Sequence, residues 1–301
     1  MPIISASFID KPTQSKLAGR LYVLAAALLW SSSGLFAKAP VFDDWSDAQR
    51  GPLLAFWRAV FAALLLLPMV RRPRWRRGLV PLALCFTLMN VTYLTAMALT
   101  TAANSIWLQS TAPWWVFLMA VFIFHEPLER KDLVPLAFGM LGVGLIVCME
   151  LAHCGGTNSI GVFSGLLSGL SYACVIVGMR ALRAENPFWL VALCHVTAAV
   201  VLLPWVIWIN VWPNLTQLAV LAGFGMLQMA IPYVLILKGL QAVSSQEVVA
   251  IGLVEPMLLP VWVYLVWGET PATWTIVGGS LILTGLVLRY FVLNRRPRAY
   301  E

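Results

Sequence analysis

The chain has 301 residues, of which 60% are hydrophobic and only 11% are charged. Soluble domains carry about 25% charged residues, so this composition excludes an ordinary soluble fold and favours a bilayer as the solvent. The net charge of +7 is concentrated at the ends of apolar segments, which indicates lipid headgroups as its partner and argues against nucleic acid.

Ten apolar segments follow one another, each near the roughly 20 residues that a helix needs to cross the hydrocarbon core. We predict an all-α membrane protein whose ten transmembrane helices span residues 17–38, 52–70, 79–99, 103–124, 132–150, 160–180, 188–209, 216–238, 246–267 and 273–293. Residues 1–16 precede the helices as a tail, and the basic residues 294–301 follow them.

Lys and Arg are concentrated in every second gap between these segments. With the N-terminus inside, all but three of the 20 Lys and Arg fall in cytoplasmic segments. Lys38 and Arg50 fall outside, and Arg58 lies within a span. The positive-inside rule therefore predicts a multi-pass protein of the cell membrane, inner or plasma, with both termini in the cytoplasm.

The chain also repeats itself, as units at 17–150 and 160–293. Segment 17–38 aligns with 160–180 at one constant offset, and 103–124 aligns with 246–267 at another. The matched pairs are Gly19 with Gly161, Trp30 with Tyr172, Lys38 with Arg180, Pro113 with Pro256, and Glu126 with Glu269. Five helices per unit put the second copy into the membrane upside down, and such inverted repeats are typical of alternating-access transporters.

Four stretches carry a family resemblance: LLWSSSGLFAK, AFWRAVFAALLLLP, STAPWWVFLMAVFIFHE and VEPMLLPVWVYLVWGE. In order and spacing they resemble the EamA-type transporters of the drug/metabolite transporter superfamily, over nearly the whole chain. The resemblance implies a 5+5 inverted-repeat bundle that moves small metabolites, often amino acids and commonly outward. Two features depart from the family: the loop after the first helix is long, and Cys194 stands at the second-unit place of Arg58.

Glu255 lies nine residues into its predicted helix, near the bilayer middle, where a charge costs about 2.5–3.5 kcal/mol on insertion scales. It needs a partner, a wet cavity or a proton. One interpretation is a cavity carboxyl that binds a substrate amine or exchanges a proton. The other is a structural contact with a neighbouring helix.

Arg58 has two interpretations as well. Its predicted depth is only six residues, so its side chain could reach the external interface and pair with Asp43, Asp44 or Asp47. Alternatively, it binds a substrate carboxylate. In contrast, Glu247 fits a capping box with Ser244 at the start of the 246–267 helix, which is a structural role.

Several prolines lie inside predicted helices, where each removes one backbone hydrogen bond, and three of them are candidate helix-breaking residues. The freed carbonyls line a cavity, meet a neighbouring helix or simply mark a packing kink. Pro113, Pro232 and Pro256 free the carbonyls of Gln109, Gln228 and Gly252, respectively.

Polar and aromatic side chains within the spans complete the predicted substrate-binding or cavity-lining set, although the aromatic members could instead fill the core. With Arg58 and Glu255, the set comprises Trp30, Asn90, Tyr93, Trp107, Gln109, Tyr172, Gln228 and Tyr233. We expect the cavity between the first, third, fourth, sixth, eighth and ninth helices.

Signals for other functions are absent. The sequence has no phosphate-binding GxxxxGK[ST] loop, so we expect no ATP-driven motor. The five cysteines have no metal-ligand spacing and are predicted to be small core residues, with no metal or cofactor bound. His195 follows Cys194 directly, and adjacent helical residues point about 100° apart, which argues against a catalytic dyad.

We therefore predict a secondary transporter of small metabolites, not an enzyme. Its partners are the substrate and the bilayer, and the pattern fits a monomer or a homodimer. Transport would be driven by the solute gradient or by proton exchange at Glu255. A carrier of nucleotide sugars or lipid-linked substrates is the alternative within the superfamily, and an intramembrane enzyme is the alternative outside it.

Overall fold

The computed structural model describes residues 15–71, 73–123, 125, 130–153 and 156–289, and all regular elements in these ranges are helical. The elements of the first half are α1 (Lys16–Ser31), α2 (Ser33–Ala37), η1 (Pro40–Phe42), α3 (Asp47–Leu66), η2 (Leu67–Met69), α4 (Leu79–Leu99), α5 (Ala102–Gln109), α6 (Ala112–Phe122) and α7 (Arg130–His153). Those of the second half are α8 (Gly156–Ala181), α9 (Pro187–Ile209), α10 (Leu215–Gly223), η3 (Phe224–Ala230), α11 (Ile231–Gly239), α12 (Ser245–Gly252), α13 (Val254–Trp267) and α14 (Thr273–Val287).

The predicted all-α membrane fold is confirmed. Within the described residues, 8 helical stretches are long and apolar enough to cross a membrane, and α14 is a shorter apolar helix. The predicted span at 103–124 is divided into α5 and α6, neither of which is long enough by itself. The count of ten spans therefore stays a prediction.

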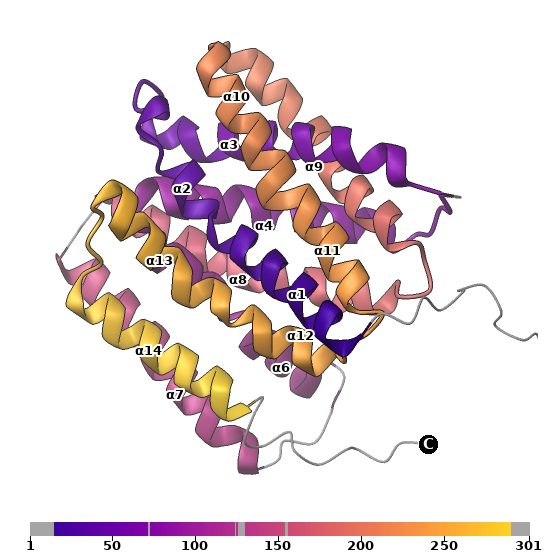
Figure 1. Ribbon diagram of the computed structural model, residues 1–301. Helices are drawn as coiled ribbons and strands as arrows, with labels where there is room; N and C mark the ends of the chain where they lie inside the picture. The colour runs from indigo at the N-terminus through magenta and orange to yellow at the C-terminus, as the bar shows by residue number, and fades with distance from the viewer. Residues whose placement is uncertain (1–14, 72, 124, 126–129, 154–155, 290–301) are drawn as a thin grey trace, which may run out of the picture.

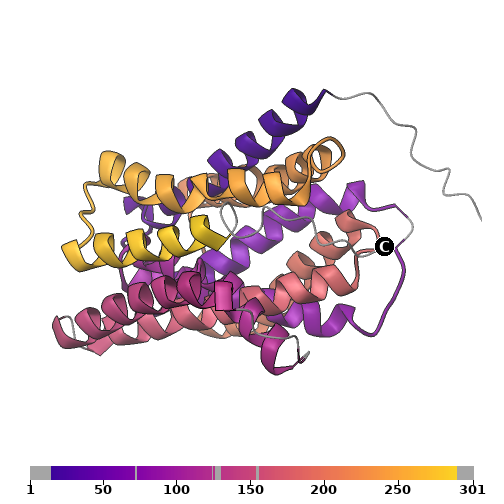
Figure 2. The same cartoon turned by 90° about the horizontal axis from the view of Figure 1, so that it is seen from below.

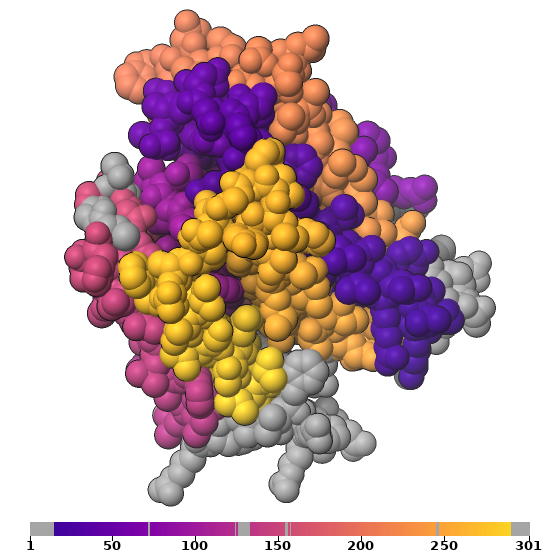
Figure 3. Space-filling model, turned by 60° about the vertical axis from the view of Figure 1, so that its left-hand side comes forward, coloured from indigo at the N-terminus to yellow at the C-terminus, as the bar shows by residue number. Residues whose placement is uncertain are grey.

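The long helices lie side by side along a common direction (Figure 2). α7 and α14 pack together at one side of the bundle (Figure 1). α13 lies between α14 and α1 on the face seen in Figure 3. The two halves of the chain interlock, because α3 packs on α9, α4 on α8, and α1 on α11.

Glycines allow the close packing of α8 on α4 and α5. A Cβ added at Gly165 would lie 2.9 Å from the Leu108 side chain, and one at Gly169 would lie 2.7 Å from the Leu108 carbonyl oxygen. The Gly161, Gly165 and Gly169 stripe therefore packs within the chain, as small residues do between membrane helices.

The first predicted helix is interrupted between α1 and α2, at Ser32. The hydroxyl of Ser31 donates to the Leu28 carbonyl (2.8 Å), and that of Ser32 donates to the Leu29 carbonyl (2.6 Å). Such bonds from serine to the preceding turn bend helices. The positions of the prolines did not predict this interruption, since none lies near it.

Two further interruptions occur at corresponding places in the two halves. α5 and α6 are separated by two residues just before Pro113, and α12 and α13 are separated by Leu253, just before Pro256. A third irregularity precedes Pro232, where η3 is a π-helical segment. A proline cannot supply the N–H of the regular ladder, and π segments are frequent at functional sites.

Candidate functional site

Arg58 of α3 forms the centre of the candidate site. Its side chain is buried, with 3% of the residue exposed. The guanidinium donates to Oδ1 of Asn90 on α4 and, at 3.3 Å, to Oε1 of Gln228 in η3. It also lies over the Phe224 ring, 4.9 Å from the ring centroid. Neutral amides and an aromatic face therefore hold a cation deep in the bundle.

The predicted pairing of Arg58 with the external aspartates is wrong. Arg50, not Arg58, forms that contact, with its guanidinium 3.0 Å from Oδ1 of Asp43. Among the described residues, no acidic oxygen lies within the 4.0 Å ion-pair limit of Arg58. A buried cation held only by neutral groups favours an anionic partner.

Glu255 is the acidic group that interacts electrostatically with this cation. It lies in the first turn of α13, directly after the interruption at Leu253, and its side chain is partly accessible. It interacts electrostatically with Arg58, Tyr93 and Tyr233, which come from three other helices. In the described part of the chain it makes no hydrogen bond or ion pair, so its carboxylate is available to a ligand.

Aromatic and hydroxyl groups surround these two charges. Trp30 meets Tyr233 edge to face, with ring centroids 5.4 Å apart. The Tyr93 hydroxyl lies 3.0 Å from Oγ of Ser33, which follows the break in the first helix. On the other side of the break, Oγ of Ser31 at the end of α1 accepts a 3.0 Å bond from the Trp262 indole. The break therefore turns two serines toward aromatic partners.

Gln228 joins the two halves of the site. Its amide nitrogen donates to the Trp30 carbonyl (3.3 Å), while its amide oxygen accepts from Arg58. Because Gln228 lies in the π-helical segment, the irregular backbone of η3 positions it between α1 and α3. The seven predicted residues that the structure brings together are Trp30, Arg58, Asn90, Tyr93, Gln228, Tyr233 and Glu255.

The other three predicted residues lie at the margin of this cluster or outside it. Trp107 is buried and donates to the Pro256 carbonyl (3.0 Å), which links the two interrupted helices. Gln109 donates to Ser168 of α8 (2.8 Å). Tyr172 is 40% exposed and interacts electrostatically with Tyr233.

Three neighbours of the cluster are absent from the predicted set. Ser33 and Phe224 contact Tyr93 and Arg58, respectively. His195 is fully buried, with its ring 4.9 Å from Phe86 and 6.2 Å from Tyr233. Only the serine run beside Trp30 could have indicated one of them, since Phe224 and His195 lie in ordinary apolar stretches.

A second polar cluster lies at the end predicted to be external. Lys38 pairs with Glu269 (2.9 Å) and donates to the Thr100 carbonyl (2.6 Å). Glu269 also accepts from the backbone N–H of Ala102 (2.7 Å). These bonds tie the end of α2 to the start of α5 and the end of α13. Glu126, the predicted counterpart of Glu269, lies outside the described residues.

Comparisons with known proteins cover almost the whole chain. A model of the EamA-like transporter family matches residues 17–148 and 159–291. An "Uncharacterized transporter" of Archaeoglobus fulgidus is 27% identical over 277 residues, which is 90% of this chain and 96% of the relative. A solved structure described as "Crystal structure of protein" shares the fold, with a TM-score of 0.64 and 16% identity over 94% of this chain and 100% of that one.

Proposed function

Because this chain belongs to the EamA-like transporter family and is a multi-pass membrane transporter, we propose that it exports amino acids or related zwitterionic solutes by alternating access. The single observation that carries the substrate class is the pair Arg58 and Glu255. The two opposite charges share one cluster, yet among the described residues they form no ion pair.

A zwitterion satisfies both charges at once. Its carboxylate would accept from Arg58, whose guanidinium has five N–H donors and so retains capacity beyond its two amide partners. Its amine would meet the Glu255 carboxylate. The ring pair of Trp30 and Tyr233 would contact the apolar part of the solute. Aromatic rings also attract an ammonium group, which favours the same orientation.

The interrupted helices support a site at this depth. Each of α2, α6 and α13 begins just after a break, so irregular backbone occurs within the bundle at three places. Irregular backbone at membrane depth is tolerated where it is buried in protein or lines a cavity. Transporters of the inverted-repeat type bind their substrates between such broken helices, near the bilayer midplane.

The contacts at the predicted external end support the proposed direction and mechanism. The end that the Lys and Arg pattern places outside is closed by contacts among Lys38, Glu269, Thr100 and Ala102. With that side closed, we propose that the site is loaded from the cytoplasm and that transport is outward. Release then requires that these bonds break while the cytoplasmic side closes. Proton exchange at Glu255 is our proposed coupling step, with the solute gradient as the alternative driving force.

The nucleotide-sugar alternative receives less support. Diphosphates require several cations, whereas Arg58 is the one Lys or Arg of the described residues within this cluster. Lys38 pairs with Glu269 at the external end, and Lys238 lies over the Tyr22 ring, 5.9 Å from its centroid. Neither lysine joins the site.

Flux through purified protein in liposomes tests the proposal. We expect uptake or efflux of at least one amino acid above that of empty vesicles, and loss of this flux in Glu255→Gln. Glu185→Gln is the matched control, because that glutamate pairs with Arg76 outside the cluster. Absence of flux over a broad panel of metabolites would refute the transporter proposal. Unchanged flux and unchanged pH dependence in Glu255→Gln would remove Glu255 from the mechanism.

A further inference from the structure

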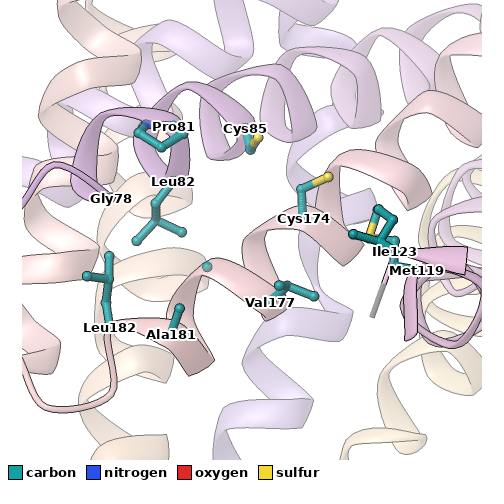
Figure 4. Close-up of a pocket in the computed structure, with 11 residues that line it drawn as sticks. Gly78, Pro81, Leu82, Cys85, Met119, Ile123, Cys174, Val177, Ala181 and Leu182 are labelled. Atoms are coloured by element: carbon teal, nitrogen blue, oxygen red, sulfur yellow. The ribbon is translucent and has the colours of Figure 1, made fainter. Parts of the chain in front are cut away.

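A separate pocket lies between α4, α6 and α8, at the ends predicted to be cytoplasmic (Figure 4). It has a volume of about 360 Å³, and its walls are almost entirely apolar. Its lining includes Pro81, Leu82, Cys85, Met119, Cys174 and Val177. None of these residues belongs to the Arg58 cluster, so the pocket is a separate site with a different lining.

Two thiols, one from each half of the chain, line this pocket. Cys85 on α4 and Cys174 on α8 both line it (Figure 4), and the two thiols interact electrostatically. Each thiol is partly exposed. Cys85 lies six residues after the start of α4 and Cys174 seven before the end of α8, which is about 9–11 Å along each helix. A lipophilic reagent can therefore reach both sulfurs.

The other described cysteines differ in position. Cys148 is exposed on α7, away from this pocket, and Cys194 is buried on α9. Cys194 interacts electrostatically with Cys85 but does not line the pocket. The prediction that the cysteines are core residues is therefore confirmed for Cys194 and wrong for Cys148.

We propose that Cys85 and Cys174 form a dithiol site for trivalent organoarsenicals, in which one arsenic atom bridges α4 and α8. An arsine oxide R–As=O reacts with two thiols to give R–As(SR′)₂ and water. Two As–S bonds form, the arsenic–oxygen double bond is lost, and both thiol protons leave in the water. Arsenic stays trivalent, so no oxidant is needed.

The pocket favours this ligand over a soft metal ion. A monovalent ion held by two thiolates would carry a net negative charge, and burying an unpaired charge among apolar groups is costly. The dithioarsenite is neutral, and its organic group would pack against Leu82, Val177 and Met119. The close contact of α4 and α8 holds the two thiols in the wall of one pocket before the ligand arrives.

The test uses full-length protein in which Cys148→Ser, Cys154→Ser and Cys194→Ala leave the pair as the only thiols. After reduction, the protein is treated with phenylarsine oxide and desalted, and its intact mass is measured. We expect one phenylarsenic group per chain, removal of this group by a small dithiol, and protection of both cysteines from maleimide. Adding Cys85→Ser or Cys174→Ser should abolish the retained adduct, because a single thiol holds arsenic only weakly.

Several results would overturn the site. An adduct retained in either single-thiol variant would show that no bridge forms. If both thiols react with maleimide but the protein retains no arsenical, the two sulfurs lie too far apart to be bridged. If the thiols react with neither reagent, the pocket is closed to both. With Cys194 present, an adduct that survives Cys174→Ser would assign the bridge to Cys85 and Cys194 instead. None of these readouts requires transport, so they are independent of the proposed function.

Discussion

The two ends of the bundle are held together by different kinds of contact. At the predicted external end, Lys38 and Glu269 are 19% and 21% exposed in their side chains, and each also bonds to the backbone. At the predicted cytoplasmic end, Arg20 and Glu247 pair at 2.6 Å, but their side chains are 53% and 35% exposed. Both pairs join the first half of the chain to the second.

The two ion pairs differ in the interactions that are lost when each pair separates. Exposed ion pairs contribute little, because water and salt replace the partner. A sheltered pair with additional backbone bonds leaves several polar groups unsatisfied when it separates. The contacts at the predicted external end are therefore the stronger closure, and those at the predicted cytoplasmic end open more easily. This asymmetry fits the proposed loading from the cytoplasm.

The largest expected effect lies between the two ends, at Arg58. Arg58→Gln removes the charge proposed to bind the substrate carboxylate, while Arg50→Gln removes a similar charge from the first turn of α3, where Arg50 pairs with Asp43. A hydrogen bond to a charged group contributes about 1.5–3 kcal/mol, so we expect a roughly 10- to 150-fold loss in transport efficiency for Arg58→Gln. Arg50→Gln should change transport little. Initial rates against substrate concentration give the measurement.

Misfolding is the competing explanation for Arg58→Gln, since Asn90 and Gln228 lose their partner. Gel filtration and thermal unfolding of the variant separate the two causes. A folded variant with normal transport would contradict the proposed role of Arg58. Equal losses in both variants would show that the charge acts at the external end and not in the cluster.

The next largest effect is expected at the Lys38–Glu269 pair, at the predicted external end. Glu269→Gln removes the ion pair and leaves Lys38 half-buried beside a neutral amide. A change of one or two kcal/mol alters a population ratio by about 5- to 30-fold, so we expect a comparable rise in external accessibility. A cysteine introduced at Ala39, which is buried beside Lys38, would report it through labelling by an impermeant maleimide.

Lys38→Met combined with Glu269→Gln serves as the control for that experiment. With no unpaired lysine left in the half-buried site, the double variant should be labelled less than Glu269→Gln alone. Equal labelling of wild type and Glu269→Gln would mean that the ion pair does not hold this end closed. The stronger closure would then have to be sought in the packing of the helices.

The sequence predicted the helices well, because long apolar segments and charged gaps are local signals. It misjudged the depth of Arg58, since the predicted helix began at residue 52. α3 begins at Asp47, five residues earlier, so Arg58 lies eleven residues into the helix, or about 16 Å. At that depth its guanidinium donates to Asn90 and Gln228, whereas Arg50 pairs with Asp43.

The contacts between side chains of distant helices were harder to predict than the depth of a residue in its own helix. Pro113, Pro232 and Pro256 marked three irregular sites, because a missing N–H is visible in the sequence. The break at Ser32 depends on serine hydroxyls that bond within their own helix, and many membrane serines do so without a break. The contacts of Ser33 and Phe224 depend on how distant helices pack, which no local pattern encodes.

The smallest effect is expected at the cytoplasmic end, where Glu247 has two separable roles. It accepts from Arg20, and it completes the predicted capping box, which the structure confirms: Ser244 accepts from the Glu247 N–H, and the Glu247 side chain accepts from the Ser244 N–H. Glu247→Gln removes the charge but keeps a capping side chain, whereas Glu247→Ala removes both. We expect transport to change by less than about twofold in Glu247→Gln, because the pair is exposed.

Glu247→Ala should lower the thermal stability of the protein more than Glu247→Gln does, since only the alanine variant loses the cap of α12. Transport assays at low and high salt sharpen the comparison, because salt screens an exposed pair and leaves a sheltered one largely intact. Wild type at high salt should therefore behave like Glu247→Gln, while the effect of Glu269→Gln persists. If Glu247→Gln instead impaired transport as strongly as Glu269→Gln, the two ends would be closed equally firmly, and the argument for loading from the cytoplasm would fail.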